Sequence, residues 1–220
     1  MTLGVLAFGA ALAFPRALGE GPRFVAAAEH VPDTCFSPGS EPGPPGWVAR
    51  VDTQLGLRMP QLENPDRRRV ARTLVGEAEA AGIDPLLVLA LIEVESSYDP
   101  GALSERGARG LMQLREPTLR REVERAGLEW RDAYDPAVNV QAGIRYLRRL
   151  LDAFGHEEVA LMAYNAGPNR ILGYLRDGEI PDRFHVYPRK VKAELRRLRR
   201  SFGGESASAV ALAGTGRPTE

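Results

Sequence analysis

The carboxyl group of Glu95 stands where the sequence predicts acid catalysis. Glu95 follows Leu91 at i+4 and Ile92 at i+3, so it extends an apolar face of a predicted helix into the last turn. Burial on such a face disfavours the charged carboxylate and raises its pKa. The group can then hold a proton near neutral pH and deliver it to a leaving oxygen. A glycosidase needs an acid of this kind.

Spacing alone leaves two alternatives open. Glu93 also has apolar neighbours, and periodicity cannot choose between Glu93 and Glu95 because the run 86–92 is apolar on every side of the helix. A glutamate near a helix end can also point to water or pair with an arginine. The surrounding motifs must therefore decide.

Three motifs follow in order along the chain. They are Glu95-Ser96-Ser97-Tyr98-Asp99-Pro100, then Ser104 with Gly107-Ala108-Arg109-Gly110-Leu111-Met112-Gln113, and later Ala163-Tyr164-Asn165-Ala166-Gly167. Together they resemble the catalytic domain of soluble lytic transglycosylases, which are relatives of goose-type lysozyme. The resemblance runs from about Ile83 to Val191 and includes Asp135-Pro136, Asn139, Gly143, Tyr146 and Leu147 between the catalytic motifs.

The resemblance implies roles for individual side chains. It makes Glu95 the catalytic acid and base and leaves Glu93 as a neighbour. The implied substrate-binding residues are Ser104, Met112, Gln113, Tyr164, Asn165 and Tyr187. Within this set, Ser104 and Gln113 would bind the sugar beside the scissile bond, and Met112 would line the cleft. Tyr164 and Asn165 would lie near the acid, where a phenol can hydrogen-bond a carboxyl group.

Two segments depart from the family pattern. Arg115-Glu116 stands where methionine and proline are common, and Arg183 stands where the family has glutamate after Ile180-Pro181, although Tyr187 fits. These differences predict a changed substrate preference sooner than lost activity.

A single carboxyl group suits a reaction without water. Asp99 before Pro100 is expected in a turn and Asp135 at a helix start, so neither is a convincing second acid. The family mechanism cleaves the β-1,4 bond between N-acetylmuramic acid and N-acetylglucosamine in peptidoglycan. The sugar's own 6-hydroxyl attacks and leaves a 1,6-anhydro end. A hydrolytic muramidase and a non-catalytic peptidoglycan-binding scaffold remain alternatives. No cofactor or metal is expected, since Cys35 is alone.

Helical periodicity predicts a mostly α, lysozyme-like globular domain around a buried central helix, with a flexible N-terminal segment and C-terminal tail. The central helix starts at Asp84-Pro85. Its neighbours are predicted at residues 66–81, 136–154, 157–164, 169–176 and 188–201. Little of the chain is typical of strands.

The ends of the chain predict segments outside the catalytic domain at 60–202. Residues 1–20 are compatible with a signal or membrane anchor, although no Lys or Arg precedes the apolar run. Residues 21–59 are expected to be a Pro/Gly-rich linker, and 203–220 a disordered tail. Membrane association would then depend on the N-terminal segment, and the expected location is the periplasm or cell envelope.

The charge balance gives no reason to expect a polyanionic partner. Lysine and arginine total 29, and aspartate and glutamate also total 29. The basic run Arg196–Arg200 is more typical of a solvated helix face than of a nucleic-acid site. We therefore expect a monomer that binds peptidoglycan glycan strands and no nucleic acid.

Overall fold

The computed structural model describes residues 46–213, with side chains described as far as Gly203 apart from Arg131. The predicted signal or anchor, most of the linker, and residues 214–220 of the predicted tail lie outside the described residues. The helices are α1 (Trp47–Arg58), α2 (Asn64–Ala80), α3 (Pro85–Ser96), α4 (Glu116–Arg125), α5 (Pro136–Phe154), α6 (Glu157–Ala166), α7 (Pro168–Asp177) and α8 (Val186–Ala213), with 3-10 helices η1 (Trp130–Tyr134) and η2 (Asp182–His185). The prediction of a mostly α fold is confirmed.

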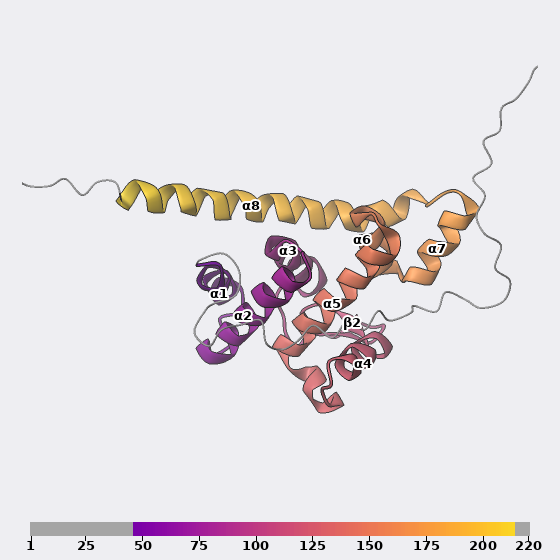
Figure 1. Cartoon of the computed structure of the whole chain (residues 1–220), viewed down its shortest axis with the longest axis horizontal. Coiled ribbons are helices and arrows are strands. Elements are labelled where there is room, and N and C mark those ends of the chain that lie inside the picture. Colours follow the sequence, from indigo (N-terminus) through magenta and orange to yellow (C-terminus); the bar gives the residue numbers. More distant parts are fainter. Residues whose placement is uncertain (1–45, 214–220) are drawn as a thin grey trace, which may run out of the picture. The chain divides into compact units, whose positions relative to one another are not determined.

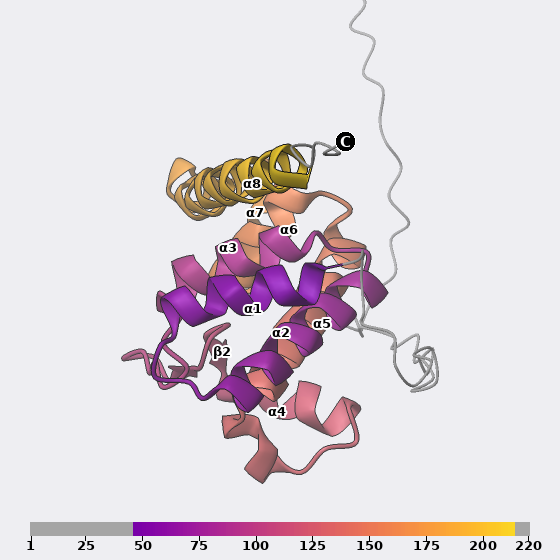
Figure 2. The ribbon, with the colours of Figure 1, turned by 90° about the vertical axis from the view of Figure 1, so that its left-hand side faces the viewer.

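Helix α3 is buried between its neighbours, as its apolar run predicts. Asp84 caps it by accepting a hydrogen bond from the Leu86 amide at 2.9 Å, and Pro85 occupies its first turn. Every side chain from Leu86 to Ile92 is buried. Helix α8 crosses over α3 and α6, and α4 lies on the opposite side of this unit (Figures 1 and 2). Because α3 is packed on all sides, the side chains on its C-terminal turn start from a rigid backbone.

Helices α2 and α5 also follow their predicted stripes. Val70, Leu74 and Ala78 of α2 are buried, and α5 ends at Gly155, whose φ of 64° suits glycine. An ion pair joins the two helices: Arg145 of α5 donates to both carboxylate oxygens of Glu77 at 2.8 Å.

Helix α1 corrects the linker prediction for residues 47–59. Val48, Val51 and Leu55 are spaced at i, i+3 and i+7 and pack into the main core. Trp47 also stacks on Phe202 of α8, with 5.9 Å between ring centroids. The Pro/Gly-rich composition ends at Gly46, so extending the linker past it ignored this apolar stripe.

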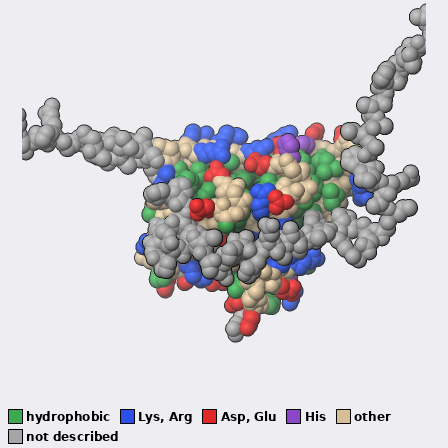
Figure 3. All heavy atoms as spheres, in the orientation of Figure 1, with side chains coloured by type: hydrophobic (Ala, Val, Ile, Leu, Met, Phe, Trp, Pro, Cys, Tyr) green, Lys and Arg blue, Asp and Glu red, His purple; other side chains and the backbone are tan. Residues whose placement is uncertain are grey.

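Helices α8 and α4 differ from the prediction as well. The structure continues α8 to Ala213, whereas 188–201 was predicted as helix and 203–220 as a tail. The basic run is exposed, but Leu198 within it is buried in the core. Figure 3 shows Lys and Arg side chains along the outer edge of α8. Helix α4 was not predicted, although Leu119 and Val123 give it a buried i, i+4 pair.

The described residues contain one small sheet. The two-residue strands β1 (Ala108–Arg109) and β2 (Leu114–Arg115) pair antiparallel, with Ala108 opposite Arg115. No helix in the described part of the chain combines the length and apolar character needed to cross a bilayer.

Candidate functional site

Glu95 lies on the last turn of α3, next to a phenol. Its side chain is partly buried, and Tyr187 from the first turn of α8 donates its hydroxyl to Glu95 Oε1 at 2.5 Å. Burial raises the pKa of Glu95 from 4.5 to about 7, and the hydrogen bond from Tyr187 offsets part of that rise. Burial, together with the negative charge of Glu95, raises the pKa of Tyr187 well above its usual value, so the phenol stays a donor.

Glu93 has a different partner from Glu95. Its Oε2 lies 2.5 Å from Nη2 of Arg58 at the end of α1. Among the described residues, the Glu95 carboxyl group instead meets the Tyr187 phenol and forms no ion pair with a cation. Of the two glutamates, Glu95 has the environment that suits an acid near neutral pH.

Tyr164 lies near Glu95 but does not hold it. Its hydroxyl donates to the Met112 carbonyl at 2.8 Å, and its ring packs against Tyr146 of α5, with centroids 5.4 Å apart. Burial, followed by the charge on Glu95, raises the pKa of Tyr164 well above its usual value. The expected phenol–carboxyl contact therefore exists, but Tyr187 supplies it and Tyr164 instead anchors the loop that follows α3.

That loop is held in an unusual conformation. Three non-glycine residues, Ser97, Tyr98 and Gln113, have φ values of 51°, 66° and 46°. Such backbone costs roughly 1–3 kcal/mol per residue and tends to gather at functional sites. The buried side chain of Asn139 on α5 fixes the loop by accepting from the Met112 amide at 2.9 Å and donating to the Arg109 carbonyl at 3.0 Å.

The side chain of Ser96, to which the sequence analysis assigns no role, ties the loop to α3. The Ser96 hydroxyl lies 3.0 Å from the carbonyls of both Ile92 and Leu111. The serine beside the glutamate therefore fixes the height of the loop over the last turn of α3. The adjacency of Ser96 to Glu95 in the first motif was the available signal.

Ser104 and Gln113 organise the same loop. Ser104 Oγ accepts from the Ala108 amide at 3.0 Å, and Gln113 Nε2 donates to the carbonyls of Ala102 and Gly110, both at 3.0 Å. Both side chains are partly exposed, whereas Asn165 is exposed at the end of α6. Ser104 and Gln113 thus lie in the loop that follows α3, Asn165 lies at the end of α6, and their contacts with a sugar remain a prediction.

Met112 does not line an open surface, contrary to the sequence prediction. Its side chain is fully buried and packs so closely on α5 that a Cβ added at Gly143 would lie 2.6 Å from Met112 Cβ. Only its backbone carries polar contacts, to Asn139 and Tyr164. Because this loop has neither helical nor strand periodicity, the sequence does not indicate which way the Met112 side chain points.

The two departures from the family pattern lie at helix ends. Arg115 precedes α4 as its N-cap residue, and Glu116 pairs with Arg120 within that helix. Arg183 donates to the Tyr174 hydroxyl of α7 at 2.8 Å and lies over the Phe184 ring at 4.8 Å. Arg183 therefore fastens η2 to α7 and does not contact Glu95.

Neither of two surface hollows contains Glu95. They measure about 500 and 300 Å³ and are lined by residues of α5, α6 and the segments beside them. The candidate site is therefore identified from the hydrogen bonds around Glu95 and not from a surface hollow. Within residues 46–213, no group of three His, Cys, Asp or Glu side chains is placed to hold a metal ion.

This chain is similar in sequence to known transglycosylases. The chain is 39% identical over 97 residues to the transglycosylase of Enterobacteria phage PRD1, covering 44% of this chain and 34% of the phage protein. It is 34% identical over 104 residues to membrane-bound lytic murein transglycosylase C of Klebsiella pneumoniae, covering 41% of this chain and 29% of that protein. The chain thus spans about a third of the length of these relatives.

Solved structures share the fold. An inactive glutamate-to-glutamine variant of the lytic transglycosylase Slt from Pseudomonas aeruginosa matches with a TM-score of 0.54 and 23% identity, over 71% of this chain and 30% of that one. The 70-kDa soluble lytic transglycosylase of Escherichia coli matches over the same shares, with a TM-score of 0.51 and 22% identity. The predicted lysozyme-like helical fold is confirmed. The family model described as "Transglycosylase SLT domain" matches residues 74–183, half of the chain, which therefore belongs to the transglycosylase SLT domain family.

Proposed function

We propose that this protein cleaves the glycan strands of bacterial peptidoglycan as a lytic transglycosylase, with Glu95 as its single acid and base. The observation that carries the proposal is the partly buried Glu95 carboxyl group, hydrogen-bonded by Tyr187 and raised in pKa to about 7. At pH 7 about half of the Glu95 side chains hold a proton, against about 0.3% for a carboxyl group with a pKa of 4.5. Membership of the family and the names of the relatives support the same activity.

The proposed reaction breaks the β-1,4 bond between N-acetylmuramic acid and N-acetylglucosamine. Glu95 gives its proton to the linking oxygen as that oxygen leaves the anomeric carbon, and the substrate's N-acetyl group stabilises the developing positive charge. The resulting Glu95 carboxylate then takes the proton of the muramyl 6-hydroxyl, and the oxygen of that hydroxyl bonds to the anomeric carbon. The product carries a 1,6-anhydro end, Glu95 is protonated again, and no water is consumed.

The carboxylates that could have served a hydrolase are engaged elsewhere. Asp99 Oδ1 accepts from the Gly101 amide at 2.8 Å, and Asp135 caps α5 and pairs with Arg69. Each of these two carboxylates therefore already has a structural contact, in a turn or at a helix cap. This distribution favours the anhydro-forming reaction over a hydrolytic muramidase.

The loop after α3 and the end of α6 are the proposed glycan contacts. Ser104, Gln113 and Asn165 lie on these segments with partly or fully exposed side chains. Tyr187 and Tyr164 are assigned to holding Glu95 and the loop, respectively. We place the activity in the periplasm or cell envelope, where peptidoglycan lies.

The test is mass spectrometry of muropeptides released from purified peptidoglycan by the full chain. We expect anhydro-muramyl products from the unmodified protein and none from Glu95→Gln. The matched control is Glu93→Gln, which makes the same change two residues away on α3 and should retain cleavage. Reducing ends in place of anhydro ends would indicate a hydrolase, and binding without release would indicate a scaffold.

A further inference from the structure

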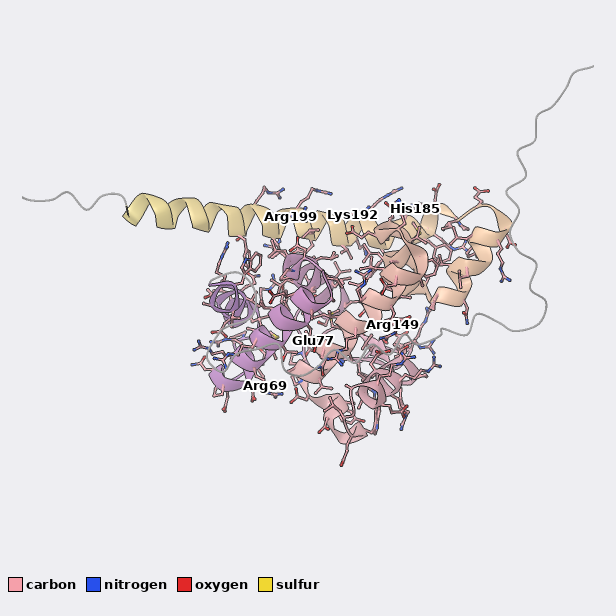
Figure 4. The ribbon with its side chains drawn as sticks, viewed as in Figure 1. Arg69, Glu77, Arg149, His185, Lys192 and Arg199 are labelled. Atoms are coloured by element: carbon pink, nitrogen blue, oxygen red, sulfur yellow. The ribbon has the colours of Figure 1, made fainter. Side chains whose placement is uncertain are left out.

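A carboxylate outside the candidate site links three elements. Glu158 of α6 lies 2.8 Å from Nδ1 of His185, at the end of η2, and 2.7 Å from Nζ of Lys192, on α8. Lys192 first and His185 second hold the pKa of Glu158 at about 2, so the carboxylate is charged throughout the neutral range. Figure 4 shows His185 and Lys192 where the start of α8 passes α6.

The two partners of Glu158 flank the residue that holds Glu95. Tyr187 lies between His185 and Lys192 in the sequence, on the first turn of α8. His185 ends η2 and Lys192 lies on α8, and both face the same carboxylate of α6. Glu158 therefore fastens α8 on both sides of Tyr187.

Apolar packing and the hydrogen bonds of Glu158 restrain α8 in different ways. The buried side chains of Val191 and Leu198 hold α8 against the core, which sets the position of the helix. Apolar contacts are not directional, whereas the Tyr187–Glu95 hydrogen bond depends on distance and angle. The charged hydrogen bonds of Glu158 supply directional restraint next to Tyr187.

We propose that Glu158 is a positioning residue, which binds His185 and Lys192 and thereby holds the first turn of α8 where the Tyr187 hydroxyl reaches Glu95. The proposal rests on the proposed role of Glu95 as acid and base. A purely stabilising role is a poor fit, because the side chains of Glu158, His185 and Lys192 are 32%, 30% and 36% exposed and such ion pairs add little to stability.

The test measures the pKa of Glu95 in the full chain by NMR titration of carboxyl-labelled glutamate. Tyr187→Phe sets the reference: it removes a hydrogen bond that lowers the pKa, so that pKa should rise by about one unit. Glu158→Ala should raise it in the same direction. Glu157→Ala, which removes the neighbouring exposed carboxylate of α6, should leave it unchanged.

Two outcomes would overturn the proposal. One is an unchanged Glu95 pKa in Glu158→Ala while Tyr187→Phe raises it. The other is a double variant, Tyr187→Phe with Glu158→Ala, in which the second change adds its own further rise, since a residue acting through Tyr187 should add nothing once the hydroxyl is gone. Thermal unfolding should show Glu158→Ala as stable as Glu157→Ala.

The same variants separate this inference from the proposed function. The NMR titration reports the Tyr187–Glu95 contact whether or not peptidoglycan is cleaved, so failure of the proposed function would appear only in muropeptide release by the unmodified protein. Where cleavage occurs, the pH profile of kcat should shift upward in Glu158→Ala as the Glu95 pKa does.

Discussion

Replacing Glu95 by glutamine should stabilise the protein at alkaline pH. The carboxyl group has a pKa of about 7 in the folded chain and an ordinary value of 4.5. Because the folded state binds this proton more tightly than the unfolded chain does, the protein loses stability as the pH rises from 4.5 to about 7. Glutamine carries no charge at any pH, and its amide oxygen can still accept the Tyr187 hydroxyl.

The size of the effect follows from the pKa difference. Each pKa unit corresponds to about 1.4 kcal/mol, so the ionised Glu95 costs about 3 kcal/mol of unfolding free energy above pH 7. For a domain of this size, that corresponds to a rise of about 6 to 12 °C in the Tm of Glu95→Gln at pH 8. Below pH 4.5 both side chains are neutral, and the pH-dependent gain disappears.

The assay is urea unfolding of the full chain at several pH values between 4 and 8, with and without Glu95→Gln. The other titrating groups are common to both proteins, so the difference isolates Glu95. Glu93→Gln provides the control: it breaks the pair with Arg58 and should give no pH-dependent gain. Parallel stability profiles for Glu95→Gln and the unmodified protein across pH 4.5 to 8 would refute the desolvation of Glu95.

Two further predictions concern the packing behind the site, both measured by denaturant unfolding. Gly143→Ala places a Cβ 2.6 Å from the Met112 side chain and should cost about 1–3 kcal/mol, whereas Gly173→Ala, with nothing within 4 Å, should be neutral or stabilise by up to about 1 kcal/mol; equal effects would contradict the close packing. Arg149→Met removes one of the two guanidinium partners of the buried Glu122 carboxylate, leaving Arg125, and should cost about 2 kcal/mol. Adding Glu122→Leu should restore most of that loss, and a double variant no better than the single one would contradict the pairing.

Much of the fold could be predicted because most helices show their own start and stop signals. Asp135-Pro136 and Gly155 bound α5 as expected, and the all-apolar run of α3 is buried as expected. Helix α1 was missed because a Pro/Gly-rich stretch directly precedes it, and its apolar stripe was assigned to the linker. Its burial depends on the next helix, α2, and on Phe202 of α8, and the pattern within α1 does not contain either contact.

In the candidate site, too, local sequence patterns predicted some features, and contacts between helices determined the others. The motif order indicated Glu95, but the spacing on α3 could not separate it from Glu93, because the two carboxyl groups differ only through residues brought in by other helices. The direction of the Met112 side chain and the exchange of roles between Tyr164 and Tyr187 were likewise hidden, since loops with positive φ have no regular period.

Three glutamates of this chain show how partners determine what a carboxyl group can do. Glu158 meets a lysine and a histidine and has its pKa lowered to about 2, which makes it a permanent anion. Glu93 meets Arg58 and is fixed as one half of an ion pair. A group that must first give and then take a proton needs both its acid form and its carboxylate form near neutral pH, and the partners of Glu158 favour the carboxylate too strongly. At Glu95 burial favours the acid and the Tyr187 phenol favours the anion, so the balance falls near pH 7, where one carboxyl group can act in both directions.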